Sequence, residues 1–331
     1  MHSAAIYGIG AYTPSKTLTN RDFEKTLDTS DEWITTRTGI KSRRIAAPEQ
    51  ATSDLCHEAA KAALENAGLR ADELDLIIVG TITPDFPFPS TACILQQKLG
   101  IAEKKIGAFD LSAACSGFIY GMHTAQAFIT SGMYRHVLVV GAEIISRLVD
   151  YTDRATCILF GDGAGAVVMG PPRLNAPSHE ILSTRIYADG SGSKLLHIPA
   201  GGSMRPPSRA TIDEKQHYVQ LDGREVFRFG VLTAVELIRD AMERHNLKKE
   251  DLGAIVPHQA NIRIIESAAE RLDLPLDLFI TNIQNYGNTS AASVPIALNE
   301  AHRAGRLPKD KPIIMLAFGA GLTWTSAVIQ W

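Results

Sequence analysis

The chain repeats part of its own sequence, and this internal duplication constrains its fold more than any other feature. Residues 62–81 (AALENAGLRADELDLIIVGT) align without a gap on residues 240–259 (DAMERHNLKKEDLGAIVPHQ), at an offset of 178 positions. Both segments have the pattern of an amphipathic helix end, a turn with a leucine, and an apolar strand. The pattern predicts two similar halves, each built of alternating strands and helices.

Two further matches occur in the same order along the chain. The offset of 178 also places residues 112–115 (SAAC) on residues 290–293 (SAAS). Near the ends of the halves, residues 160–169 (FGDGAGAVVM) resemble residues 318–329 (FGAGLTWTSAVI) at an offset of 156. The first half is therefore expected to carry roughly 22 extra residues before its last strand, a size typical of a functional loop.

The alternation of strands and helices predicts an α/β protein of duplicated halves with mostly parallel, buried sheets. The Pro-rich, polar segment 170–180 (GPPRLNAPSHE) marks the expected boundary between them. An N-terminal half, residues 1–175, and a C-terminal half, residues 176–331, follow from it. Ligands of such sheets bind beyond the carboxyl ends of the strands, so polar residues that follow a strand are candidates for the site.

Composition excludes several classes of protein. A formal net charge of −3 argues against a general nucleic-acid or membrane-surface binder. The four cysteines show neither disulfide nor zinc spacing, so we expect no metal site and a reducing compartment. No apolar run is long enough to cross a bilayer, and the first residues lack the pattern of a signal peptide. A cytoplasmic location without membrane or nucleic-acid partners is the expectation.

One cysteine lies in an unusual local context. Residues 109–118 (FDLSAACSGF) place Cys115 where a strand-like run gives way to small residues and then to a helix that is apolar on nearly every face. At the N-terminus of such a helix, free N–H groups and the helix dipole favour a thiolate. A lone cysteine is more often a small core residue, so this interpretation depends on partners that serve the thiol.

The second half supplies two such partners. His258 follows the strand-like residues 252–256 (LGAIV), and Asn288 lies in the turn that repeats the cysteine turn. The duplication thus brings Cys115, His258 and Asn288 together, and a thiol beside a histidine is the usual arrangement of an activated cysteine. Papain-like proteases share the order Cys, His, Asn, but their cysteine lies near the mature N-terminus in a different local sequence.

Six segments together resemble β-ketoacyl-acyl-carrier-protein synthase III, a family of the thiolase superfamily. They are residues 28–40 (DTSDEWITTRTGI), 110–118 (DLSAACSGF), 152–167 (TDRATCILFGDGAGAV), 256–264 (VPHQANIRI), 285–293 (NYGNTSAAS) and 318–324 (FGAGLTW). The resemblance covers essentially the whole chain. It implies a thiolase-like, five-layered αβαβα sandwich, a homodimer, and an acyltransferase that begins fatty-acid synthesis.

The resemblance also implies a reaction. Cys115 matches the family nucleophile, which takes a short acyl group, such as acetyl, from acyl-CoA as a thioester. Malonyl-acyl-carrier protein then loses CO₂ and joins that acyl group, giving 3-oxoacyl-acyl-carrier protein. His258 and Asn288 match the pair that donates hydrogen bonds to the enolate formed in this step. The CoA thioester is a substrate, and no further cofactor is implied.

Several residues match supporting positions of the family. The backbone N–H groups of Cys115 and Ala320 match the oxyanion hole, and alanine keeps this donor where many relatives have glycine, provided that its φ is negative. Phe318 matches an aromatic residue beside the cysteine, although a plain core role explains it nearly as well. The matched CoA contacts are Trp33, Arg37, Arg154, Thr29, Gly223 and Asn261. The matched carrier-protein contacts are Arg263, Arg228 and Arg271, with Glu270 where some relatives have lysine. Phe88 matches a residue that enters the partner subunit's acyl pocket.

Two alternatives within the superfamily were weighed. Thiolases need a second cysteine in the C-terminal Gly-rich turn, and residues 318–324 contain none. A specialised synthase-III relative in secondary metabolism, with another starter or with acyl transfer to oxygen or nitrogen, is the closest alternative. The pair His258 and Asn288 favours carbon–carbon bond formation, because simple acyl transfer needs no enolate stabilisation.

Overall fold

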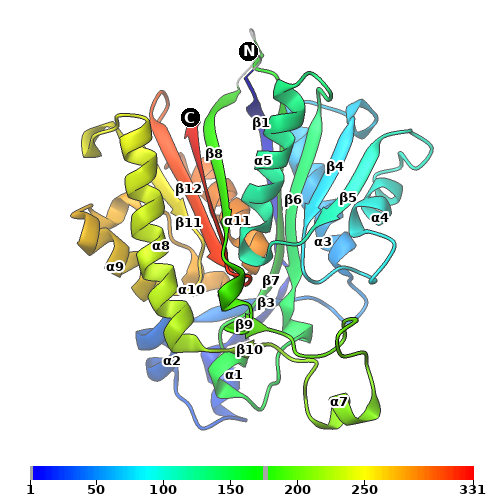
Figure 1. Ribbon diagram of the computed structural model, residues 1–331, viewed down its shortest axis with the longest axis vertical. Coiled ribbons are helices and arrows are strands. Elements are labelled where there is room, and N and C mark those ends of the chain that lie inside the picture. The colour runs from blue at the N-terminus through cyan, green and yellow to red at the C-terminus, as the bar shows by residue number, and fades with distance from the viewer. Residues whose placement is uncertain (1–2, 174–177) are drawn as a thin grey trace.

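The computed structural model describes residues 3–173 and 178–331, which form two similar halves (Figure 1). The nine long strands form one mixed sheet: β1 (Ala5–Tyr12), β4 (Leu76–Gly80), β5 (Gly107–Leu111), β6 (Val137–Ile144), β7 (Asp162–Gly170), β8 (His179–Ala188), β11 (Ala254–Pro257), β12 (Pro312–Gly319) and β13 (Thr323–Gln330). The helices of the layers are α3 (Thr52–Ala67), α4 (Thr91–Lys98), α5 (Gly117–Thr130), α8 (Gly223–Arg244), α9 (Ile262–Leu272) and α11 (Ser293–Arg303).

Shorter elements connect these strands and helices. The small strands are β2 (Lys16–Thr19), β3 (Ser42–Ile45), β9 (Leu196–His197) and β10 (Gln220–Leu221). The short helices are α1 (Asn20–Glu24), α2 (Asp31–Thr38), α6 (Arg154–Cys157), α7 (Arg209–Asp213) and α10 (Ile283–Tyr286). The 3-10 turns are η1 (Ala71–Glu73), η2 (Ala114–Ser116), η3 (Ile145–Arg147), η4 (Gly190–Gly192), η5 (Lys249–Asp251), η6 (Leu276–Leu278) and η7 (Ser290–Ala292).

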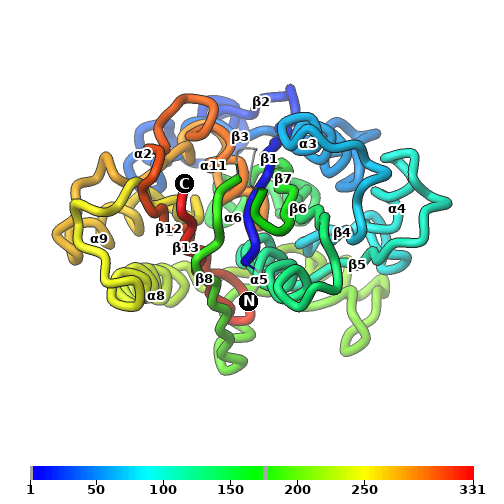
Figure 2. Tube along the Cα trace, turned by 90° about the horizontal axis from the view of Figure 1, so that it is seen from above, coloured from blue at the N-terminus to red at the C-terminus, as the bar shows by residue number. Residues whose placement is uncertain are grey.

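The layers follow from which faces are apolar. The strand order is β11-β12-β13-β8-β1-β7-β6-β4-β5, and the halves meet at β8 and β1 through only two residue pairs. Helices α5 and α11 lie between the two half-sheets (Figure 2) and pack against strands of both halves. Their apolar side chains form the central core together with those of the strands. Helices α3 and α4 cover the outer face of one half-sheet, and α8 and α9 cover that of the other. The fold is the predicted five-layered αβαβα sandwich.

The expectation of mostly parallel sheets is wrong. The pairs β4–β5, β4–β6 and β11–β12 are parallel, whereas β1–β7, β6–β7, β12–β13, β1–β8 and β8–β13 are antiparallel. The reason is the short connection, since residues 320–322 alone join β12 to β13 and a tight turn reverses the chain. The equivalent connection from β6 to β7, residues 145–161, is longer. Its short elements η3 and α6 do not carry the chain across the sheet to a parallel position.

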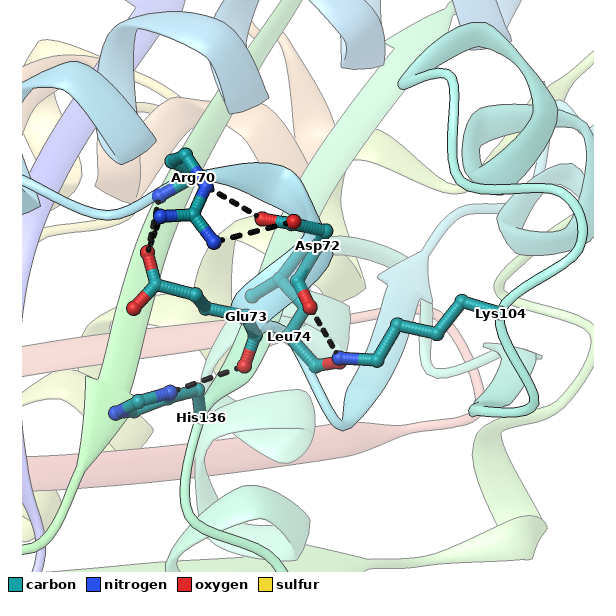
Figure 3. Close-up of polar contacts among 6 residues, drawn as sticks. All are labelled: Arg70, Asp72, Glu73, Leu74, Lys104 and His136. Carbon is teal, nitrogen blue, oxygen red and sulfur yellow. Dashed lines mark hydrogen bonds and ion pairs between the residues drawn. The ribbon is translucent and has the colours of Figure 1, made fainter.

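The duplication extends to individual hydrogen bonds in the turn that follows α3 and α8. Lys104 Nζ donates to the carbonyl oxygens of Asp72 and Leu74 and so fixes η1 (Figure 3). The bonds that repeat at the offset of 178 are those within the turn: the Arg70 N–H donates to Glu73 Oε2 at 2.9 Å, and the Lys248 N–H donates to Asp251 Oδ2 at 2.7 Å. The offset predicted from the sequence therefore holds for this turn and for the strands β4 and β11 that follow it.

The offset does not hold at the cysteine turn. Ala114 and Ser290 have left-handed backbones, with φ of 46° and 48°, and each begins a 3-10 turn that leads into a central helix. Ala114 therefore corresponds to Ser290, and Cys115 to Ala291 rather than to Ser293. The predicted alignment is displaced by two residues. The position of the left-handed residue determines where the 3-10 turn begins, and the similar small side chains do not.

The extra segment of the first half is real but shorter than predicted. It has 17 residues, 145–161, where the second half has three, 320–322, so the excess is 14 residues rather than 22. The predicted boundary segment 170–180 runs from the end of β7 to the start of β8. The predicted division between residues 175 and 176 lies outside the described residues. Within residues 3–173 and 178–331, no helix combines the length and apolar character needed to cross a membrane.

Candidate active site

Cys115 lies in η2, between the end of β5 and the start of α5, where the sequence predicts it. Its side chain is only 5% exposed, and it points out of a turn whose preceding residue, Ala114, is left-handed. A left-handed non-glycine residue is a strained conformation that surrounding structure must hold in place. The turn therefore presents one thiol at the N-terminus of a central helix, at the edge of the sheet where ligands bind.

The expectation of a resting thiolate is wrong. Burial raises the pKa of the Cys115 thiol to about 12, and the charge of the nearby Glu143 raises it further, while the polar contact with the Ser290 side chain opposes them. The helix N-terminus does not outweigh this burial. Cys115 is therefore a thiol at neutral pH, and its proton has to leave during reaction.

His258 follows β11 directly and is 2% exposed. Burial lowers the pKa of its imidazole to about 3, so the ring is neutral at physiological pH. Its Nδ1 lies 2.6 Å from Ser293 Oγ, which also accepts a hydrogen bond from the Gln259 backbone at 3.3 Å. We assign the Ser293 hydroxyl as the donor and His258 Nδ1 as the acceptor of this hydrogen bond. The proton of the neutral ring then lies on Nε2, which is free to donate.

Asn288 precedes η7 and is 8% exposed. Its side-chain Oδ1 accepts a hydrogen bond from the Ser290 backbone at 2.8 Å, so its Nδ2 remains as the donor. Its backbone joins the first half, donating to the Leu159 carbonyl at 2.8 Å and accepting from Gly161 at 3.1 Å. The Asn288 turn is therefore fixed by both halves of the chain.

Contacts at the end of β12 bring the three groups to one place. The ring of His258 packs edge-to-face on Phe318, with centroids 5.6 Å apart. The next residue, Gly319, contacts Cys115, and Ser290 lies beside the thiol from the Asn288 turn. Phe318 also packs on Phe229 in the core, as a plain core aromatic does. A nucleophile and two neutral donors thus surround one point.

The backbone around Cys115 supplies further donors. The hydrogen bond of its turn runs from the Ser116 N–H to the Ala113 carbonyl, which leaves the Cys115 N–H unused within the turn. Ala320 is not among the residues with positive φ, so the condition set for its N–H is met. Thr323 Oγ1 lies 3.0 Å from the Ala113 carbonyl and 3.1 Å from the Ala320 carbonyl, and so holds the two segments together.

A cavity of about 200 Å³ opens beside the thiol. Cys115, Ala320 and Ser290 form its polar end, and apolar side chains form most of its remaining wall: Ile82, Ile145, Phe160, Leu196, Ile198 and Val219. Phe88 does not line it. This side chain is 85% exposed on the loop between β4 and α4, where it is free to contact another molecule.

The predicted CoA contacts form a group at the outer end of the site. Helix α2 carries Trp33 and Arg37, and α6 begins with Arg154. The guanidinium carbons of Arg37 and Arg154 lie 4.8 and 4.7 Å from the Trp33 ring centroid. Arg154 also donates to the Asp28 carbonyl. The arrangement forms a stacking site for a flat aromatic group, and Arg154 closes it in this structure.

Three other predicted CoA contacts differ in their surroundings. The Thr29 hydroxyl is buried and has no hydrogen-bond partner among the described residues, as expected of a group that awaits a ligand. Asn261 caps α9 and donates to the Arg37 carbonyl at 3.1 Å, so it supports the stacking site. Gly223 begins α8 and faces open space.

The three predicted docking arginines are exposed but do not form one patch. Arg263, at the start of α9, lies over the ring of Phe227, and Arg228 follows on the neighbouring α8. Arg271, at the far end of α9, lines a separate groove with Arg239. The eight-residue spacing of Arg263 and Arg271 therefore separates them along the helix.

Four residues that support the site were not predicted from the sequence. Ser293 orients His258, and Glu143 accepts a hydrogen bond from Ser290. Thr323 joins the oxyanion segments, and the fully buried Arg43 donates to Asn20 and to the Ile158 carbonyl behind α2 and α6. A charged residue inside a strand-like run, such as Glu143 in residues 137–144 (VLVVGAEI), was the one signal available.

Comparison with known families gives two matches. Residues 109–190 match the family described as 3-oxoacyl-[acyl-carrier-protein (ACP)] synthase III. Residues 242–331 match the family described as 3-oxoacyl-[acyl-carrier-protein (ACP)] synthase III C terminal. The first range contains Cys115, and the second contains His258 and Asn288.

Individual proteins are similar over almost the whole chain. The beta-ketoacyl-[acyl-carrier-protein] synthase III of Caldanaerobacter subterraneus is 54% identical over 329 residues, which cover 99% of this chain and 98% of that protein. The crystal structure of 3-oxoacyl-[acyl-carrier-protein] synthase III from Aquifex aeolicus has a TM-score of 0.89 at 48% identity, covering 99% of this chain and all of that one. The priming beta-ketosynthase of the R1128 polyketide pathway has a TM-score of 0.89 at 37% identity, covering 99% of this chain and 96% of that one.

Proposed function

This chain belongs to the β-ketoacyl-acyl-carrier-protein synthase III family, and from that premise we propose how its residues carry out the family's reaction. The chain is an acyltransferase that condenses a short-chain acyl-CoA with malonyl-acyl-carrier protein, the first condensation of fatty-acid synthesis. The alternative of a specialised synthase-III relative in secondary metabolism is not favoured. The relatives that are 46–54% identical to this chain are named beta-ketoacyl-[acyl-carrier-protein] synthase III.

In the first half-reaction, the Cys115 sulfur attacks the carbonyl carbon of the acyl-CoA thioester. A carbon–sulfur bond to Cys115 forms, the bond to the CoA sulfur breaks, and the thiol proton leaves with CoA as its free thiol. The N–H groups of Cys115 and Ala320 donate to the oxyanion of the tetrahedral intermediate. Because the resting thiol has a pKa of about 12, proton loss has to accompany the attack.

In the second half-reaction, the malonyl thioester takes the place of CoA. Its terminal carboxylate leaves as CO₂, and the electron pair of that bond forms an enolate whose oxygen accepts hydrogen bonds from His258 Nε2 and Asn288 Nδ2. The enolate carbon then attacks the acyl carbon of the Cys115 thioester, and the bond from that carbon to the Cys115 sulfur breaks. The sulfur takes up a proton from solvent, which restores the resting thiol. Two preorganised donors fit this step, since one such donor stabilises a transition state by ~3–4 kcal/mol. A neutral His258 serves as a donor throughout the cycle.

The cavity beside Cys115 sets the size of the starter. A protein cavity of roughly 150 Å³ holds benzene, so one of about 200 Å³ has room for about six carbon atoms in a single chain. We propose a homodimer in which the exposed Phe88 of each chain enters the other chain's cavity and shortens this space. A short starter such as acetyl then fits it.

The substrates reach the thiol from the α2 and α9 side. Trp33 and Arg154 separate to admit the adenine of CoA between them, and the unpartnered Thr29 hydroxyl accepts or donates a hydrogen bond to the ligand. The acidic carrier protein docks on the exposed Arg263 and Arg228. Arg271, which faces the other groove, contributes little.

The observation that supports this function best is the buried Cys115 turn facing a neutral His258 and the Asn288 turn. The test is the intact-protein mass after incubation with a panel of acyl-CoAs, with Cys115→Ala as the control. A stoichiometric gain confined to the wild type establishes the acyl-enzyme and identifies the starter. Added malonyl-acyl-carrier protein should then discharge it to a 3-oxoacyl product. If no acyl-CoA adds mass, the proposed first half-reaction is wrong.

A further inference from the structure

A buried carboxylate connects the loop that follows β4 to the Asn288 turn. Glu143, at the end of β6, is 0% exposed and forms no ion pair within the described part of the chain. Its oxygens accept hydrogen bonds from Thr83 Oγ1 at 2.7 Å, and from Thr81 Oγ1, Ile82 N and Ser290 Oγ at 3.2 Å each. Three of these donors follow β4 in the first half, and the fourth belongs to the Asn288 turn of the second half.

The bond to Ser290 continues to Asn288. The Ser290 backbone N–H donates to Asn288 Oδ1 at 2.8 Å, while the Ser290 hydroxyl donates to Glu143. Ser290 has a left-handed backbone, with φ of 48°, a conformation that its surroundings must hold in place. Glu143 thus fixes the residue that leaves Asn288 Nδ2 free to donate.

The other donors connect Glu143 to the acyl cavity. The Ile82 side chain lines the cavity beside Cys115, and its backbone N–H is held by Glu143. Glu143 itself does not line this cavity, so it acts on the substrate only through other residues. Four neutral donors converge on it, and a carboxylate suits them because it is an acceptor at both oxygens.

We propose that Glu143 is a positioning residue of the condensation step, which holds Ser290 so that Asn288 presents its amide to the malonyl thioester. The inference rests on the proposed function, because it assigns Asn288 to enolate stabilisation. Acylation of Cys115 uses the backbone donors of Cys115 and Ala320 and does not need the Asn288 side chain. Loss of Glu143 is therefore expected to slow the second half-reaction far more than the first.

The test is a double-mutant cycle with Glu143→Gln, Ser290→Ala and the double variant. Acylation is followed by intact mass with acyl-CoA, and condensation by kcat and KM for malonyl-acyl-carrier protein. We expect each single variant to lower the condensation kcat about 10- to 100-fold. In Glu143→Gln, whose side chain does not line the cavity, acylation should change less than about threefold. Ser290→Ala removes a cavity-lining hydroxyl beside the thiol, so this variant is judged by its condensation kcat. The double variant should be no slower than the slower single variant, because both changes break one chain of hydrogen bonds.

Asp162→Asn is the matched control. Asp162 is also a buried carboxylate that accepts neutral donors, but these belong to Ala46 and Ser146 rather than to the Asn288 turn. Its substitution should leave the ratio of condensation to acylation unchanged. Ser290→Ala keeps the inference testable if Glu143→Gln does not fold.

Equal loss of both half-reactions in Glu143→Gln overturns the inference, and so does a double variant whose loss of condensation kcat equals the product of the two single losses. Wild-type condensation kinetics in Ser290→Ala would also overturn it. A failure of the proposed function is distinguishable from these results, because the wild type itself would then form no acyl-enzyme.

Discussion

Gly319 lies directly against Cys115. A β carbon at Gly319 would be 2.9 Å from both the backbone nitrogen and the Cβ of Cys115, and 3.2 Å from its sulfur. Gly319 is the last residue of β12, so a strand of the second half ends against the turn that carries the thiol of the first. This contact places the N–H of the next residue, Ala320, beside the Cys115 sulfur.

Gly319→Ala should therefore displace Cys115 from the oxyanion donors. We expect acylation to slow about 100-fold, the effect of losing one such donor. Intact mass against time with acyl-CoA measures it. Gly190→Ala is the matched control, since Gly190 has no positive φ and nothing within 4 Å of its added carbon. Acylation of Gly319→Ala at the wild-type rate would show that the turn yields to the added carbon.

Substitution of the reacting groups should separate the two half-reactions. Cys115→Ala is expected to abolish acylation, whereas His258→Ala should still acylate and lose condensation about 100- to 1,000-fold, because its donor acts on the enolate. Intact mass measures the first step, and product formation from malonyl-acyl-carrier protein measures the second. If His258→Ala does not acylate, the histidine acts in the first step as well.

Trp33→Ala should weaken CoA binding without affecting the chemistry. Stacking of a base on an aromatic ring contributes ~1–3 kcal/mol, so KM for acyl-CoA should rise about 5- to 150-fold. The adenine must also displace Arg154, whose guanidinium lies 4.7 Å from the Trp33 ring, because stacking on both sides needs about 7 Å. The KM for malonyl-acyl-carrier protein is the internal control. An equal rise in both KM values would contradict a CoA-specific role.

Arg43→Met should destabilise the support of the CoA site. The buried guanidinium donates to Asn20 Oδ1 at 2.6 Å and to the Ile158 carbonyl at 2.9 Å, and Asn20 in turn donates to Asp31 in α2. Two buried acceptors lose their donor, at ~1–3 kcal/mol each, so the free energy of unfolding should fall by about 2–6 kcal/mol. Urea unfolding measures this, together with a raised KM for acyl-CoA. The neighbouring Arg44→Met, whose donor reaches only Ser15 at 3.3 Å, should cost less than about 1 kcal/mol.

Glu143 should make stability depend on pH in a defined direction. Burial raises the pKa of its carboxyl from 4.5 to about 7, so the folded state binds a proton between these values that the unfolded state releases. Its stabilising contribution is complete below about pH 4.5 and is lost as the pH rises through about 7. Relative to Glu143→Gln, the wild type should lose roughly 3 kcal/mol of unfolding free energy between pH 4.5 and pH 8. Urea unfolding of both proteins at both pH values measures this. If the difference in unfolding free energy between the two proteins is the same at pH 4.5 and at pH 8, the prediction is wrong.

Local sequence patterns predicted the duplication but not the strand directions, and the five-layered sandwich was implied by the family resemblance. The repeated helix end, turn and strand of residues 62–81 and 240–259 predicted two similar α/β halves, and the structure forms them with the same turn hydrogen bonds in each. These patterns are local because hydrophobic period and turn residues act over a few positions. The same matching failed at residues 112–115, where a left-handed residue rather than similar letters determines the register.

The sequence by itself thus determined the duplicated sandwich, the family, and the positions of Cys115, His258 and Asn288 at the ends of elements. Only the tertiary structure decided their chemical state and their support. The thiol is protonated and the imidazole neutral because burial removes water that would stabilise their charged forms. Ser293, Glu143 and Arg43 became visible only when segments more than 30 residues apart in the chain came within hydrogen-bond distance. A hydrogen bond depends on position in space, and no local period of the sequence encodes it.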